Sequence, residues 1–118
     1  MQNCNDSAFF IMSLTPSYVY HMYFEFHDRF LENKNYHEYI ISKDARVSRW
    51  YATFAINGRF KLGEPAIATN LYESHDYVKD IVKGRFELGE LVLSTNKSYF
   101  RLYILCFNHD YKLYYKFI

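Results

Sequence analysis

The chain has 118 residues, of which 50% are hydrophobic and 21% aromatic, and its formal net charge is +1. This length suits one domain, and the apolar content excludes a disordered polymer. The balanced charge excludes both the broad positive field of a typical nucleic-acid binder and an acidic surface that mimics DNA.

The two cysteines, Cys4 and Cys106, lie near opposite ends of the sequence without CxxC or Cys/His spacing. This arrangement predicts neither a disulfide framework nor a zinc site. No apolar run approaches the roughly 20 residues of a membrane-spanning helix, and the first residues lack the pattern of a secretory signal. We therefore expect a cytoplasmic protein that does not associate with a membrane.

A 13-residue string occurs twice: GRFKLGEPAIATN at 58–70 returns as GRFELGELVLSTN at 84–96, so the offset is 84 − 58 = 26 residues. A fixed offset of this size is typical of stacked repeats. We expect a single all-α domain, a short helical repeat array of about four helix pairs. The units run roughly over 6–33, 34–59, 60–85 and 86–118.

The long helix of each unit is expected to begin after a short polar residue. Asp44, Asn70 and Asn96 are good N-caps, because their side-chain oxygens can accept bonds from the free N–H groups of the first turn. Gly58 and Gly84 stand where a left-handed residue would end the helix. The predicted long helices are Pro16–Leu31, Asp44–Asn57, Asn70–Lys83 and Asn96–His109.

A short second helix is expected between each glycine and the next cap, where Pro65 fits the first turn. Asn57-Gly58 between aromatic stretches also fits a β-hairpin. We favour the helix, because KDIVKGRF in the next unit keeps the glycine within a helical pattern. The equivalent apolar positions of the two short helices are Leu62, Ala66 and Ile67, matched by Leu88, Val92 and Leu93.

Several equivalent positions predict structural contacts. Tyr51 and Tyr77 lie on the apolar stripe of successive long helices, so we expect both to be core residues. Ion pairs that hold the fold are expected at two equivalent places, Arg59 with Glu64 and Arg85 with Glu90.

The sequence offers little for catalysis. Its histidines, His21, His27, His37, His75 and His109, fall in different units without the i, i+4 spacing of a helical metal site. No nucleophile motif or phosphate-binding glycine loop is present. We expect no enzyme activity, no cofactor and no metal.

The basic residues Arg46, Arg49, Arg59 and Lys61 are candidate contacts for nucleic acid or another partner. The next unit carries acidic residues, including Glu73 and Glu87, at nearby equivalent positions, so the basic patch does not continue along the array. A solvated surface is favoured, and nucleic-acid binding remains an alternative.

The C-terminal aromatic residues are candidates for self-association. Terminal repeats need a polar outer surface, yet this chain ends in YKLYYKFI. The segment is either a cap that closes the last unit or an interface for a homodimer. The residues concerned are Tyr111, Tyr114, Tyr115 and Phe117.

The 26-residue unit resembles tandem repeats of uncharacterised, mostly phage-encoded proteins, in which a tyrosine-rich helix ends in a D-V-I-K-G-R-like string before a short E-P-containing helix. The resemblance covers about 43–96 and lies in the string 80–85 and in Glu64-Pro65. It implies a helical repeat array. It also suggests a non-enzymatic protein that binds and inhibits a host protein, such as a CRISPR or other defence component. The alternatives are a nucleic-acid-binding module and a structural, self-assembling protein.

Overall fold

The computed structural model describes residues 14–106, and every regular element in this range is a helix. The α-helices are α2 (Pro16–Glu25), α3 (His27–Glu32), α4 (Lys34–Ile41), α5 (Ala45–Trp50), α6 (Glu64–Ile67), α7 (Leu71–Tyr77), α8 (Glu90–Leu93) and α9 (Lys97–Cys106). Two π-helices, η1 (Tyr51–Ile56) and η3 (Val78–Val82), extend α5 and α7. Two 3-10 turns, η2 (Lys61–Gly63) and η4 (Glu87–Gly89), lead into α6 and α8.

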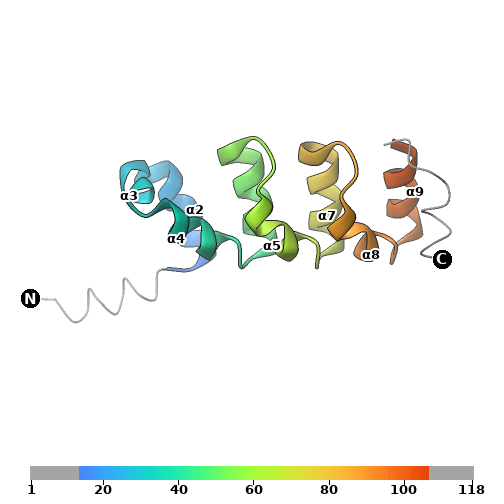
Figure 1. Ribbon diagram of the computed structural model, residues 1–118, viewed down its shortest axis with the longest axis horizontal. Coiled ribbons are helices and arrows are strands. Elements are labelled where there is room, and N and C mark those ends of the chain that lie inside the picture. Colours follow the sequence, from blue (N-terminus) through green and yellow to red (C-terminus); the bar gives the residue numbers. More distant parts are fainter. Residues whose placement is uncertain (1–13, 107–118) are drawn as a thin grey trace, which may run out of the picture.

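The long helices stand side by side in a row, and the short helices lie along one edge of that row (Figure 1). This arrangement confirms the predicted all-α repeat array. The hairpin alternative at Asn57-Gly58 is excluded, because Asn57 follows a π-helix and no strand occurs within 14–106.

The predicted N-caps are confirmed. Asp44 Oδ1 accepts a hydrogen bond from the backbone N–H three residues later at 2.9 Å. Asn70 and Asn96 accept the equivalent bond at 3.0 Å. Each long helix of units two to four therefore begins where a side-chain oxygen satisfies its free N–H groups.

The prediction that Gly58 and Gly84 are the left-handed residues is wrong by one position. The positive φ angles belong to Asn57 (55°) and Lys83 (49°), and neither glycine has one. The last turns are π-helical, as the bond from Lys83 N–H to Val78 O at 2.8 Å shows. A π-helical turn holds more residues than an α-helical one, so α-helical spacing misplaces the reversal of the chain.

The first predicted helix, Pro16–Leu31, is also divided in the structure. At Phe26 the backbone leaves helical geometry, with φ −138° and ψ 60°, and the chain continues as α3. The change of direction buries Phe30 completely, with its ring 5.2 Å from that of Tyr23 and 5.9 Å from that of Tyr51. Packing against a neighbouring unit thus outweighs continuation of the helix. The predicted helix Asn96–His109 is observed as α9, and its last residues lie outside the described range.

The core repeats with the sequence. Tyr51, Tyr77 and Tyr103, each 26 residues apart, are all buried, which confirms the predicted core positions of the first two. A second buried column, Ile41, Ile67 and Leu93, packs from the short helices. Because each column draws on successive units, the core runs continuously along the array.

Candidate protein interface

A cluster of polar groups joins units two and three. The Tyr77 hydroxyl donates a hydrogen bond to Glu64 Oε2 at 2.7 Å and accepts one from the Phe60 backbone N–H at 3.0 Å. Arg59 grips the same carboxylate with two bonds, Nε to Oε2 at 2.7 Å and Nη2 to Oε1 at 2.9 Å. The paired geometry satisfies a carboxylate that is almost fully buried.

The same junction cluster recurs one unit later. Tyr103 donates to Glu90 Oε2 at 2.8 Å and accepts from the Phe86 N–H at 2.8 Å. Arg85 bonds both oxygens of Glu90, at 2.8 and 3.3 Å. The predicted pairs of Arg59 with Glu64 and of Arg85 with Glu90 are therefore confirmed as contacts that hold the fold.

Titration in the junction cluster follows from burial and hydrogen bonding. Burial, followed by the bond to Glu64, raises the pKa of Tyr77 above its ordinary value. Burial alone would raise the pKa of Glu64, but the hydrogen bonds from Arg59 and Tyr77 outweigh it and leave that pKa below its ordinary value. The carboxylate thus stays ionised at neutral pH and acts as a fixed acceptor.

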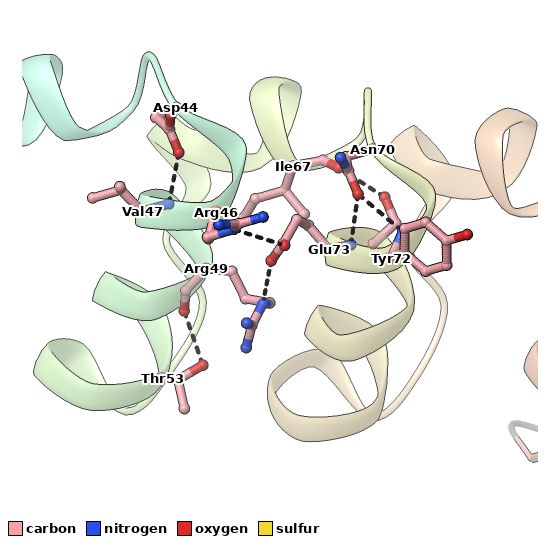
Figure 2. A network of polar contacts seen from close by, with 10 residues as sticks. Asp44, Arg46, Val47, Arg49, Thr53, Ile67, Asn70, Tyr72 and Glu73 are labelled. Atoms are coloured by element: carbon pink, nitrogen blue, oxygen red, sulfur yellow. Dashed lines mark hydrogen bonds and ion pairs between the residues drawn. The ribbon is translucent and has the colours of Figure 1, made fainter. Parts of the chain in front are cut away.

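A second polar network joins α5 to α7 (Figure 2). Arg49 Nε donates to Glu73 Oε1, and Arg46 Nε lies 3.7 Å from Glu73 Oε2. The Arg49 side chain is 15% exposed, whereas that of Arg46 is 68% exposed. Arg49 is therefore committed to an internal ion pair, and Arg46 keeps most of its surface in solvent.

The four predicted basic contact residues gather around two separate carboxylates. Arg46 and Arg49 lie at Glu73, and Arg59 is bound to Glu64. Lys61 is exposed beside the same junction cluster, where its charge lowers the pKa of Glu64 further. The predicted self-association residues, Tyr111, Tyr114, Tyr115 and Phe117, lie outside the described residues.

Exposed aromatic side chains mark one edge of units one and two. Phe24 and Phe26 end α2, and Phe54 and Ile56 lie in η1; these four are between 41% and 63% exposed. The Tyr23 hydroxyl reaches Ala55 O at 3.4 Å, so the two helix ends adjoin each other. We call Phe24, Phe26, Phe54 and Ile56 the aromatic edge.

Sequence reasoning missed the aromatic edge, although one signal was available. Adding 26 to the position of Phe54 gives Asp80, an acidic residue on the next repeat. A large apolar residue in a column where a neighbouring unit carries a charge is exposed by the fold itself, because equivalent positions share equivalent surroundings. Comparison of the columns would have identified Phe54 as a surface aromatic.

Within residues 14–106, no group of three or more His, Cys, Asp or Glu side chains is placed to hold a metal ion. No helix in this range is long and apolar enough to cross a membrane. Comparison with family models, curated proteins and solved structures found no match.

Proposed function

We propose that the protein is a non-enzymatic protein-binding module that engages its partner through the aromatic edge. The observation that carries this proposal is the gathering of Phe24, Phe26 and Phe54 at two adjoining helix ends, each at least half exposed. Contiguous exposed apolar side chains are typical of interaction sites, and aromatic residues supply much of the energy of protein interfaces.

The pairing of the basic residues supports a protein partner over nucleic acid. Arg49 and Arg59 each bind a carboxylate of the chain itself, so their charge is largely neutralised before any ligand arrives. The overall charge of +1 adds little attraction for a phosphate backbone. Arg46 and Lys61 remain the exposed cations on which the nucleic-acid alternative depends.

The state of the buried carboxylates supports binding rather than catalysis. Glu64, Glu73 and Glu90 are all buried, and each is paired with an arginine. A general acid or base must reach a substrate proton, whereas these groups already face internal donors. Their repetition at a fixed register is what stacked units require.

The partner class that we propose is a host protein, such as a CRISPR or other defence component, which the module inhibits by occupying its surface. The resemblance of the repeat to phage-encoded units supports this choice. Repeat surfaces recognise partners by shape and scattered side chains.

Capture from bacterial lysate with the tagged full-length chain tests the proposal, with nuclease added to remove bridging nucleic acid. Phe54→Asp is the informative variant, because Asp80 already occupies the equivalent position of the next unit and the fold accepts it there. Tyr72→Ser is the matched control: Tyr72 is 62% exposed outside the aromatic edge, and Ser98 holds its equivalent position.

We expect one identified protein that survives nuclease treatment, is kept by Tyr72→Ser and is lost with Phe54→Asp. A partner retained by Phe54→Asp would contradict the aromatic edge as the binding surface. Loss of every partner on nuclease treatment, together with loss on Lys61→Ala, would support the nucleic-acid alternative instead.

A further inference from the structure

The short helices carry a second exposed apolar surface, which repeats. Tyr36, Leu62 and Leu88 stand 26 residues apart, as do Tyr39, Pro65 and Leu91. All six are exposed, and the five large ones among them are 47% to 70% exposed. We call these six residues the short-helix face.

The fold explains why the two columns share one side of the molecule. Within each unit the two residues are three positions apart, a spacing that puts them on one face of a helix. The intervening residues point inward: Gly63 and Glu64 are buried between Leu62 and Pro65, and Gly89 and Glu90 are buried in the next unit. The short helices α4, α6 and α8 follow one another along the same edge of the row (Figure 1).

Charge varies beside this regular apolar surface. Lys61 precedes Leu62, and Glu87 holds the equivalent position before Leu88. Both charged residues are exposed. The two units therefore present the same apolar pair flanked on the same side by opposite charges.

This pattern is complementary to itself in one orientation. If two copies met face to face in parallel, Lys61 would oppose Lys61 and Glu87 would oppose Glu87. If they met antiparallel, about a twofold axis between units two and three, Leu62 would face Leu88 and Lys61 would face Glu87 of the other copy. Like charges in register are costly and opposite charges fix the register, so the antiparallel arrangement is favoured.

We propose that the short-helix face binds a second copy of this chain, antiparallel, with Lys61 of each copy against Glu87 of the other. The sequence continues both columns: a further step of 26 reaches Tyr114 and Phe117, which lie outside the described residues. This pairing does not depend on the proposed function, because the aromatic edge is a different set of residues and either surface can fail alone.

Sedimentation equilibrium of the full-length chain and three charge variants tests this inference. Lys61→Glu and Glu87→Lys each place like charges together at both symmetric contacts. The double variant Lys61→Glu/Glu87→Lys restores opposite charges. Each residue already occupies the equivalent position of the neighbouring unit, so the substitutions import charges that the register accepts.

We expect a dimer for the parent chain, a dissociation constant raised roughly tenfold or more by each single reversal, and recovery to within about threefold by the double reversal. Circular dichroism melts of all four proteins separate dissociation from unfolding. A monomeric parent chain, a dimer that ignores the single reversals, or a double variant no better than the single ones would overturn the proposal.

Discussion

The junction between units one and two differs from the junction between units two and three, although a tyrosine bonds a glutamate in both. Tyr51 donates to Glu38 at 2.7 Å in the first, and Tyr77 donates to Glu64 at 2.7 Å in the second. The arginine does not recur: the position equivalent to Arg59 is Asn33. The tyrosine–glutamate bond is therefore the constant part of the repeat, and the arginine accompanies the deeper burial of Glu64.

The glycine of the repeat shows the same division. Gly63 is replaced by His37 in the first unit, where the residue lies within the regular helix α4 and His37 Nδ1 lies 2.7 Å from Phe30 O. In the second unit a Cβ at Gly63 would lie 2.5 Å from Ser48 Oγ and 2.7 Å from Phe60 Cδ2. Glycine is thus required where a short 3-10 turn brings the backbone against the preceding long helix, and not where a longer helix spaces them.

The largest expected effect comes from removing the constant element. Tyr77→Ala should lower the free energy of unfolding by about 3–5 kcal/mol, because it deletes a fully buried ring and leaves Glu64 and the Phe60 N–H without their shared partner. Urea denaturation followed by circular dichroism measures it. Lys79→Ala, an exposed position of the same long helix, should change stability little; equal losses in both variants would refute the assigned core.

Filling the space at the close approach should have the next largest effect. Gly63→Ala should destabilise by about 1–3 kcal/mol, since its Cβ would meet Ser48 and Phe60 well inside van der Waals contact. Gly58→Ala is the matched control: the nearest atom to its Cβ would be 3.7 Å away, and its φ is not positive. If both alanines were tolerated equally, the close approach would not constrain the sequence.

Neutralising the carboxylate should distinguish the two junctions. Glu64→Gln should cost about 1–2 kcal/mol at neutral pH, and Glu38→Gln less, because Glu38 is more exposed and the arginine is replaced by Asn33. The lowered pKa of Glu64 in the folded protein contributes stability above the ordinary carboxyl pKa, and this stability is lost as the pH falls below about 4.

Denaturation midpoints measured between pH 7 and pH 3 check this difference. The parent chain should lose more stability on acidification than Glu64→Gln, because glutamine has no proton to gain. Identical slopes for the two proteins would show that the junction cluster does not hold Glu64 ionised.

The smallest expected effect concerns the left-handed residues that end the π-helices. Lys83→Gly should stabilise by about 0.5–1 kcal/mol, because lysine at φ 49° is strained and glycine is not. Asn57→Gly should have almost no effect, since asparagine tolerates this conformation. Thermal melts of both variants measure the contrast, and a loss of stability in Lys83→Gly would show that the lysine side chain contributes more than the strain costs.

Local sequence signals predicted much of the fold. The 26-residue offset predicted the array, the short polar residues predicted the helix starts, and the equivalent tyrosines predicted core columns, because each depends on hydrogen bonds or periodicity within one unit. The break at Phe26 was not predictable in this way, since no glycine or proline marks it and its cause is the packing of Phe30 against the next unit. The π-helical ends misled the assignment of the left-handed residues for a related reason, because α-helical spacing was assumed.

The interaction surfaces were less accessible to sequence reasoning. The basic residues drew attention as charges, yet Arg49 and Arg59 are bound to internal carboxylates that come from 24 and 5 residues away. Exposed apolar residues such as Phe54 and Leu88 resemble core residues until the fold assigns each column to the inside or the outside.

The hydrogen bonds of the junction clusters have a consequence for how the chain folds. They join residues only 5, 13 and 17 positions apart, so no cluster has to wait for a distant part of the sequence. Local contacts of this kind are associated with fast folding, since little chain entropy is lost in closing each loop. During synthesis, each tyrosine that leaves the ribosome would find its glutamate already present in the preceding unit, and the array would assemble from its first unit onward at the pace of translation.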